Sequence, residues 1–325
     1  MEKDLYPHLP RAKGKLAGGV PARREWRSMA LSSPIQPSVA TTPDGLESLG
    51  RPLLDLDLTL QSGQVFHWEA HGAGFAGLVG RVALYLEQRS GELLVTRGRA
   101  ALARRYLALD HPLDAILAGF PDDPTLREAS AACAGMRILR QPLWECLATF
   151  ITSSMKQVAH IRAMSLAIRE RFGVPVRAFG RTFHAYPDAD AVAGAGERAL
   201  RECGLGFRAP NLVRTAATVA AGEADLEGWR ALPTGELRER LCGLPGVGVK
   251  VANCVLLFAY ERLDCIPVDV WIERILRSVY LRGKRKVTAA RMARFAAEYF
   301  GPYGGYAQQY LFHHARMTWK RGDRR

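Results

Sequence analysis

The six cysteines of this chain of 325 residues form no CxxC pair and show no spacing typical of metal ligands. Scattered single cysteines are typical of reducing compartments, so we expect an intracellular protein. No apolar run approaches the length of a membrane span, and the N-terminus lacks the apolar core of a signal peptide. These absences argue against the metal-centre, secreted and membrane-embedded classes. The cysteines are at positions 133, 146, 203, 242, 254 and 265.

Positive charge, by contrast, is abundant. The formal net charge is +13 and 48% of the residues are apolar, and the pI is about 9.8. This length and apolar content are sufficient for two or three domains with a sizeable core. The basic excess is typical of proteins that bind polyanions, above all nucleic acids, although a merely basic soluble protein would show it too.

Residues 1–50 differ in composition from the rest of the chain. They are rich in proline, glycine, serine, alanine and basic residues, and they show no hydrophobic periodicity. We therefore expect a flexible basic tail. It would either hold nucleic acid non-specifically or be inert, and Met29 is an alternative start of the natural protein.

The next part of the chain is typical of β-structure. Apolar and polar residues alternate in Leu54–Leu60 (LDLDLTL), which predicts a half-buried strand. Gly77–Gln88 and Glu92–Arg97 are further predicted strands, separated by glycine and serine turns. Sequential short strands of this kind favour an antiparallel sheet.

From residue 99 onward the pattern becomes helical. A long apolar segment over residues 142–172 begins at a proline and ends at a glycine, and we expect two helices there, broken near residues 152–157. The predicted fold class is therefore α+β, mainly α. An antiparallel sheet subdomain with short helices would occupy residues 51–135, and a helical domain would occupy residues 136–325.

The strongest motif of the chain reads LCGLPGVGVKVANCVLLFAYERLDCIPVDVW. Proline and glycine in Leu244–Gly248 end one helix, and the apolar run that follows predicts a second helix over Val249–Tyr260. The amides of Gly246, Val247 and Gly248 can point outward together at the start of that helix. Bare amides at a helix N-terminus favour an anion such as a phosphate.

Two side chains with chemical potential flank this turn. Lys250 lies one turn into the second helix, and Asp269 occupies a good N-cap position for the helix that follows. A lysine and a carboxylate beside a phosphate-binding turn form a candidate nucleophile-and-carboxylate pair. Alternatively, Lys250 is a surface lysine that contacts phosphate, and Asp269 is purely a helix cap.

LPGVGVKVA followed by PVDVW resembles the helix–hairpin–helix and Gly/Pro…Asp signature of base-excision DNA glycosylases. The chain from about Leu53 to Trp319 is similar to the 8-oxoguanine DNA glycosylase branch in particular, with the helix–hairpin–helix at residues 234–260. The resemblance implies that the amine of Lys250 attacks C1′ of the deoxyribose and forms a Schiff base, after which β-elimination can nick the strand. Asp269 would stabilise the positive charge that develops at C1′.

The same resemblance implies a partner and the absence of a cofactor. The partner would be double-stranded DNA that contains oxidised guanine, and the protein would act as a monomer. No metal is needed for the lysine chemistry. The endonuclease III branch of the superfamily carries a four-cysteine iron–sulfur cluster near its C-terminus, but no cysteine follows Cys265 here, so we expect no cluster.

A base pocket is also implied by separated motifs. The element Ser62–Trp68 resembles the family's SGQ-x-F-x-W segment, in which the carbonyl of Gly63 would face the lesion base. 8-Oxoguanine carries a hydrogen on N7 where guanine has a lone pair, so a carbonyl there favours the lesion. A GPY-x-G-x-AQ-xx-LF segment would supply an amide to read the base edge and an aromatic face for stacking. The pocket residues would be Gly63, Cys254, Pro267, Gln308 and Phe312.

Further residues are expected to contact DNA around the flipped nucleotide. The element CGLGFRA places Phe207 as a wedge and Arg208 as a donor beside the orphaned base. Met155 and His160 stand where animal and fungal relatives carry an asparagine and an arginine, so strict preference for cytosine opposite the lesion is not implied. Trp271 stands where eukaryotic relatives have a histidine, and we expect it to contact the DNA backbone.

Two alternatives stay open at this point. A monofunctional alkylpurine glycosylase of the same superfamily would share the hairpin and the aspartate but lack Lys250. A non-enzymatic DNA-binding module could use the hairpin as a plain phosphate grip. Lesion-dependent cleavage distinguishes the enzymes from the binding module, and the released base distinguishes the two enzymes.

Overall fold

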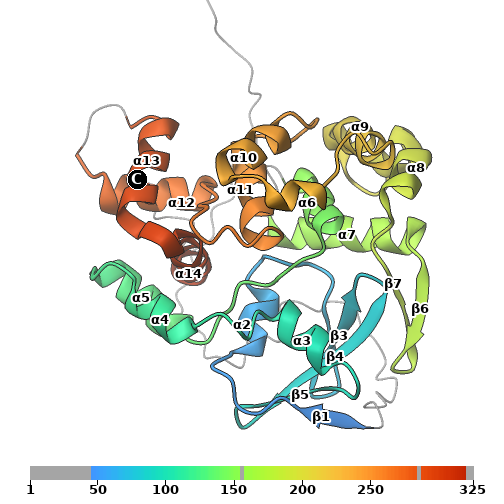
Figure 1. Cartoon of the computed structure of the whole chain (residues 1–325), viewed down its shortest axis with the longest axis horizontal. Coiled ribbons are helices and arrows are strands. Elements are labelled where there is room, and N and C mark those ends of the chain that lie inside the picture. Colours follow the sequence, from blue (N-terminus) through green and yellow to red (C-terminus); the bar gives the residue numbers. More distant parts are fainter. Residues whose placement is uncertain (1–44, 154–156, 284–286, 320–325) are drawn as a thin grey trace, which may run out of the picture. The chain divides into compact units, whose positions relative to one another are not determined.

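The computed structural model describes residues 45–153, 157–283 and 287–319. Its N-terminal part is a five-stranded sheet with the strand order β1-β5-β4-β3-β2 (Figure 1). Every neighbouring pair is antiparallel, as predicted. The strands are β1 (Leu46–Ser48), β2 (Glu69–His71), β3 (Gly74–Val79), β4 (Val82–Arg89) and β5 (Glu92–Thr96).

The prediction of a strand at Leu54–Leu60 is wrong. This segment contains helix α2 (Leu56–Gln61), whose N-terminus is capped by Asp55. The Asp55 carboxylate accepts a hydrogen bond of 2.9 Å from the amide of Leu58. The buried residues Leu56, Thr59 and Leu60 have the spacing i, i+3, i+4, so the short alternating pattern also fits one face of a helix.

Two boundaries also differ from the expected ones. The segment Gly77–Gln88 is not one strand but parts of β3 and β4, which pair through a tight turn between Val79 and Val82. The sheet begins at Leu46, where β1 pairs with β5, rather than after residue 50. The rest of the expected tail, residues 1–44, lies outside the described residues.

The C-terminal part is helical, and a two-stranded ribbon, β6 (Pro175–Ala178) and β7 (Arg181–His184), is inserted in it. The predicted break of the long apolar segment is confirmed, because α6 ends at Thr152 and α7 begins at Val158. The helices that follow α2 are α3 (Ala100–Tyr106), α4 (Leu113–Ala118), α5 (Pro124–Ala132), α6 (Leu143–Thr152), α7 (Val158–Phe172), α8 (Ala189–Glu202), α9 (Ala209–Ala220), α10 (Thr234–Cys242), α11 (Val249–Phe258), α12 (Val270–Ile275), α13 (Ala289–Phe300) and α14 (Gly304–Thr318). Short 3-10 or π segments lie at Gly206–Arg208, Gly228–Ala231, Leu276–Tyr280 and Gly301–Tyr303.

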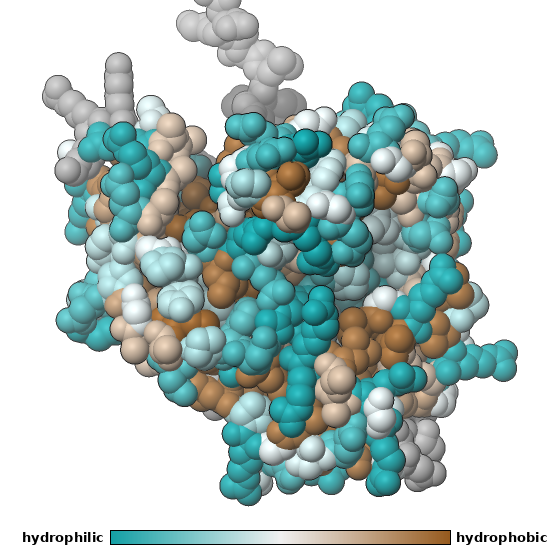
Figure 2. Space-filling view, in the orientation of Figure 1, coloured by the Kyte–Doolittle hydropathy of each residue, from teal (hydrophilic) through white to brown (hydrophobic). Residues whose placement is uncertain are grey.

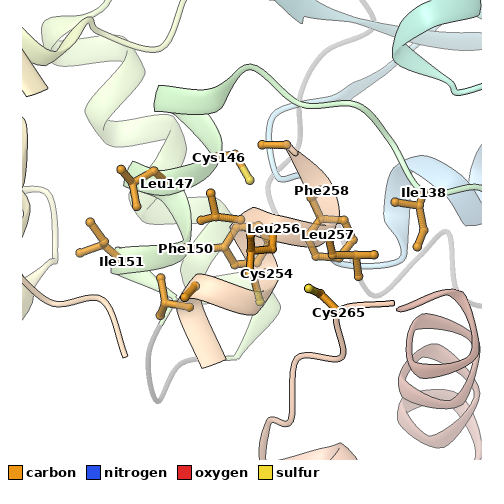
Figure 3. Packing of buried hydrophobic residues seen from close by; sticks show 14 of the residues in the cluster. Ile138, Cys146, Leu147, Phe150, Ile151, Cys254, Leu256, Leu257, Phe258 and Cys265 are labelled. Atoms are coloured by element: carbon orange, nitrogen blue, oxygen red, sulfur yellow. The ribbon is translucent and has the colours of Figure 1, made fainter. Parts of the chain in front are cut away.

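Helix α11 is buried along most of its length, and this burial fixes the position of its first turn. All residues from Val251 to Phe258 are buried except Asn253. Phe258 stacks on Phe150 of α6 with 5.4 Å between ring centroids and an interplanar angle of 10°, and Figure 3 shows this packing between the two helices. Burial of an aromatic side chain stabilises a fold by about 1.5–3 kcal/mol, so α11 cannot shift without a large loss.

The turn before α11 packs on helix α9. Gly246 has φ +79°, and a side chain there would meet Asn211 at 2.8 Å. The hydroxyl of Thr215 donates to the carbonyl of Pro245 at 2.8 Å. Helices α10 and α11 with this turn are the predicted helix–hairpin–helix, and α9 holds its tip in place.

Candidate active site

A cavity of about 1010 Å³ opens where α11, the start of α12 and α14 meet the loop after α2. In Figure 2 the face drawn is mostly hydrophilic, with apolar residues visible between the hydrophilic ones. Most residues predicted for the active site line this single cavity. They are Gly63, Gly246, Gly248, Lys250, Cys254, Pro267, Asp269, Trp271, Gln308 and Phe312.

Lys250 lies in the first turn of α11 and projects toward α6. Its Nζ lies 3.2 Å from Oγ of Ser153 and 5.4 Å from the centroid of the Phe150 ring. The Ser153 hydroxyl donates to the carbonyl of Phe150 at 2.7 Å, so its lone pairs are available to accept from the lysine. The amine is therefore oriented by a neutral acceptor and an aromatic face, and no carboxylate is paired with it among the described residues.

Asp269 caps helix α12, as predicted. Its Oδ1 accepts hydrogen bonds from the amides of Trp271 at 3.0 Å and Ile272 at 2.9 Å. Burial raises the pKa of Asp269 above its ordinary value, and the two amides and the charges of Lys250 and Arg316 oppose this shift. The cap and a role in chemistry are compatible, because the same carboxylate also lines the cavity.

The loop before Asp269 is held by Asn253, a half-buried residue of α11. The side-chain amide of Asn253 donates to the carbonyl of Ile266 at 3.0 Å, and its oxygen accepts from Arg238 at 2.9 Å. Pro267 follows directly and is buried in the cavity wall. The spacing between Lys250 and Asp269 is thus set by a hydrogen bond from the helix that carries the lysine.

The hairpin turn differs from the prediction at one position. The amide of Val247 donates to the carbonyl of Leu244 at 3.1 Å, so it does not point outward. Among the described residues, no acceptor is bonded to the amides of Gly246 and Gly248. The expectation of three outward amides is therefore wrong for Val247, because the turn closes on itself through that amide.

Gly63 lies in a tight loop between α2 and β2. Its φ of +94° is a conformation that side chains rarely adopt, and a Cβ atom there would lie 3.0 Å from Nη1 of Arg316 and 3.4 Å from Cε1 of Phe312. Glycine is therefore required both by the backbone and by the space in the cavity. The next residue, Gln64, is buried and ties the loop to the carbonyl of Arg137 at 2.8 Å.

Helix α14 forms the wall opposite α11. The Oε1 atom of Gln308 is buried and has no hydrogen-bond partner among the described residues. A buried amide oxygen without a partner is costly in a folded protein, and it is often completed by a ligand. Phe312 lies one helical turn further on, and the guanidinium of Arg316 lies over its ring at 5.2 Å from the centroid. This wall combines an aromatic face with polar groups.

Cys254 faces the cavity from the α11 side. The residue is 3% exposed. Burial raises the pKa of the Cys254 thiol, and the charge of Lys250 only partly offsets this. The side chain is therefore a small neutral surface in the wall, opposite the aromatic ring of α14.

Four predicted DNA contacts among the described residues lie outside the cavity lining: Val247, Phe207, Arg208 and His160. Phe207 is 61% exposed, and the Arg208 guanidinium lies 4.2 Å from its ring centroid. Arg208 itself is buried, and its Nη1 donates to the carbonyl of Leu205 at 3.3 Å. His160 is exposed on α7. Met155 lies outside the described residues.

Sequence reasoning missed some residues of the site. Ser153, Gln309 and Arg316 line the cavity, and none was singled out for a role. Arg316 lies four residues after Phe312 on the same face of α14, so helical spacing from the recognised motif would have indicated it. Ser153 gave no such signal, because its partner Lys250 is 97 residues away.

A lysine and a half-buried carboxylate share a cavity with an aromatic face and with an amide oxygen that has no partner in the described part of the chain, beside a helix–hairpin–helix. This fold and site define a DNA glycosylase of the base-excision type. Residues 49–147 match the model of the 8-oxoguanine DNA glycosylase N-terminal domain, and residues 149–300 match that of HhH-GPD superfamily base excision DNA repair proteins. The chain belongs to the 8-oxoguanine DNA glycosylase family.

Relatives of known structure or name agree with this assignment. N-glycosylase/DNA lyase OGG1 of Arabidopsis thaliana is 31% identical, with 80% of this chain and 76% of the plant protein covered. The structure of MBOgg1 with a low-affinity DNA ligand is 30% identical with a TM-score of 0.80, and 86% of this chain and 98% of that chain are covered. The 8-oxoguanine glycosylase/lyase of Clostridium acetobutylicum, in complex with double-stranded DNA that contains cytosine opposite 8-oxoG, is 27% identical with a TM-score of 0.78, covering 84% and 98%.

No helix among the described residues is both long enough and apolar enough to cross a membrane.

Proposed function

We propose that this protein excises 8-oxoguanine from double-stranded DNA and nicks the resulting abasic site through a Schiff base on Lys250. One observation carries the proposal: Lys250, Asp269, Gly63, Gln308 and Phe312 line the same cavity although they come from distant parts of the chain. The pocket would hold the base next to the nucleophile that would release it. The family assignment and the lyase named among the relatives support the same reaction.

The chemical step assigned to Lys250 is a displacement at C1′. The neutral amine of Lys250 attacks C1′, and the C1′–N9 bond breaks with its electron pair going to the base. The nitrogen then loses one proton, and its lone pair forms the C1′=N bond of an iminium as the C1′–O4′ bond of the sugar ring breaks and O4′ takes up a proton. Loss of a proton from C2′ then breaks the C3′–O3′ bond and nicks the strand. The carboxylate of Asp269 stabilises the positive charge at C1′.

Recognition of the lesion base is assigned to the opposite wall. The base would stack on Phe312, with Cys254 and Pro267 on the α11 side of the pocket. The buried Oε1 of Gln308 would accept from an N–H on the Watson–Crick edge. The carbonyl of Gly63 would accept from N7–H, which 8-oxoguanine has and guanine lacks.

Other residues would contact the DNA backbone and fill the gap that the flipped nucleotide leaves in the duplex. The amides of Gly246 and Gly248 have no acceptor in the described ranges and suit a phosphate next to the flipped nucleotide. Trp271 lines the same cavity, and the guanidinium of Arg274 lies 5.1 Å from the centroid of its ring. The exposed ring of Phe207 is suited to wedge into the base stack. We propose that the protein does this as a monomer, without a cofactor, on DNA inside the cell.

Borohydride trapping tests the proposal. The substrate is a duplex with a single 8-oxoguanine placed opposite each of the four bases in turn. We expect a covalent adduct with the wild-type protein and none with Lys250→Ala. Yields across the four duplexes measure the preference for the opposite base.

Other results would point to another class. Release of the base without an adduct would indicate a water nucleophile and a monofunctional enzyme. Equal binding to damaged and undamaged duplex, without release or adduct, would indicate a DNA-binding module.

A further inference from the structure

One face of helix α14 is directed at the backbone just before Gly63. Nη1 of Arg316 donates to the carbonyl of Ser62 at 3.0 Å. Nε2 of Gln309 lies 3.4 Å from the same oxygen. Gln309 and Arg316 are seven residues apart, or two turns, so both project from one side of the helix. A carbonyl oxygen has two lone pairs, so it can accept from more than one donor of α14.

The peptide after Gln64 is also held by hydrogen bonds. The carbonyl of Gln64 accepts from Nε2 of Gln141 at 2.7 Å. The side-chain oxygen of Gln64 accepts from the amide of Leu139 at 2.8 Å. Gly63 and the peptide that carries its carbonyl thus lie between two peptides that are held by side-chain hydrogen bonds. These bonds limit the directions in which the Gly63 carbonyl can point.

Arg316 is more than a surface partner of this loop. It lines the cavity, it lies over the ring of Phe312, and its Nη1 is 3.0 Å from the place where a Cβ of residue 63 would be. The bond to Ser62 is its one hydrogen bond among the described residues. No ion pair within 4.0 Å ties it to a carboxylate in that part of the chain. The direct contacts of its guanidinium in the described part of the chain are thus with the loop and the aromatic wall, and its charge also acts on Asp269.

We propose that Arg316, assisted by Gln309, is the positioning residue that gives the Gly63 carbonyl its ability to distinguish 8-oxoguanine from guanine. The proposal rests on the proposed function, in which that carbonyl accepts from N7–H. A carbonyl rewards N7–H and repels the lone pair of guanine only if it cannot rotate. If the loop is released from α14, the carbonyl is no longer fixed in the direction of N7, so its hydrogen bond to the lesion weakens. The carbonyl can also rotate away from the N7 lone pair of guanine, so the repulsion that excludes guanine falls.

The abasic-site reaction separates this role from a general structural one. Nicking of an abasic site uses Lys250 but involves no base, so the Gly63 carbonyl takes no part in it. Excision of 8-oxoguanine requires both. The ratio of the two single-turnover rates therefore reports on base recognition alone.

The experiment compares Arg316→Met, Arg316→Lys, Gln309→Leu and the control Arg127→Met, whose arginine is 63% exposed on α5. We expect Arg316→Met to slow excision of 8-oxoguanine about ten- to hundredfold and abasic nicking by no more than about twofold. Arg316→Lys keeps one donor and should recover part of the loss. Gln309→Leu removes the longer bond and should have a smaller effect, and the control should match the wild type.

A binding measurement adds a second, independent readout. In a Lys250→Gln background, which cannot turn over, fluorescence anisotropy gives the affinity for duplexes with 8-oxoguanine and with guanine. The preference for the lesion should fall about tenfold when Arg316→Met is added.

Two results would overturn the inference. Unchanged excision and preference in Arg316→Met would show that the loop holds without α14. Equal losses of excision and abasic nicking, with a lower melting temperature and no recovery in Arg316→Lys, would show a merely structural role. If the wild type nicks abasic sites but does not release 8-oxoguanine, the proposed substrate itself is wrong.

Discussion

The two walls of the cavity are built in different ways. On the α11–α12 side, Lys250 and Asp269 lie within one short motif, and Asn253 from the same motif sets their spacing. On the opposite side, the loop at Gly63 meets helix α14, and the bond between Ser62 and Arg316 joins residues 254 positions apart. The groups proposed for bond breaking are thus encoded locally, and those proposed for base recognition are assembled from both ends of the chain.

This difference suggests that chemistry and recognition can be impaired separately. Substitutions on the α11–α12 wall should reduce reaction with every substrate, including abasic DNA. Substitutions on the α14 wall should change which base is released and leave abasic DNA as a substrate. Each change below tests one side of that comparison.

The largest effect is expected from Lys250→Gln. Glutamine keeps similar length but has no nucleophilic amine, so excision and nicking should fall at least about a thousandfold. Borohydride trapping should give no adduct, while gel-shift binding of 8-oxoguanine duplex persists. Residual excision near the wild-type rate would refute the role of Lys250.

Asp269→Asn should slow excision about a hundredfold. Asparagine is also a good N-cap, so the helix should keep its stability and the loss should report on the charge. Because burial raises the pKa of Asp269, its ionised form is lost at a higher pH than for an ordinary aspartate. The wild-type rate should therefore fall as the pH drops through that raised pKa, and the variant should lack this acidic limb. An unchanged single-turnover rate would show that Asp269 serves only as the N-cap of α12.

Gly63→Ala should slow excision of 8-oxoguanine at least about tenfold. The new methyl group would stand 3.0 Å from Arg316 and 3.3 Å from Val158 in a strained backbone conformation, so the loop must shift and its carbonyl with it. Abasic nicking should remain within about twofold of the wild type, in line with the base-independent use of Lys250. Parallel loss of both rates would contradict the separation of the two walls.

Gln308→Leu should change selectivity more than rate. 8-Oxoguanine and 8-oxoadenine both carry N7–H but differ on the Watson–Crick edge, so the preference between them should fall about tenfold. The variant also removes a buried oxygen for which the described residues supply no partner. Its unfolding free energy, measured with urea, should therefore be equal to or up to about 1 kcal/mol above that of the wild type. A clear loss of stability would indicate an internal role for the amide.

The smallest effect is expected from Phe207→Ala. The ring is 61% exposed, so the unfolding free energy should change by no more than about 0.5 kcal/mol. Affinity for a lesion duplex should fall several-fold, because the wedge would no longer fill the gap in the base stack. Equal affinity of variant and wild type in fluorescence anisotropy would show that Phe207 does not enter the duplex.

The sequence predicted a feature well where the residues that cause it lie close together in the chain. The cap at Asp269 and the break after Thr152 were predicted correctly, because both follow from residues a few positions away. The helix α2 was mistaken for a strand, because a six-residue segment with three buried side chains fits both the period of a helix and the period of a strand. The N-cap at Asp55 decides in favour of the helix. The prediction that the amide of Val247 points outward was wrong, because this amide donates to the carbonyl of Leu244 within the turn.

The sequence by itself determined the helix–hairpin–helix, the place of Lys250 in the first turn of α11 and the family to which the chain belongs. These depend on glycine, proline and capping residues, whose backbone preferences act over a few positions. Only the tertiary structure decided that Ser153 orients the lysine and that Arg316 and Gln309 hold the loop at Gly63. Such hydrogen bonds join residues 97 to 254 positions apart, and they form because packing brings the helices together rather than because of any local preference of the chain.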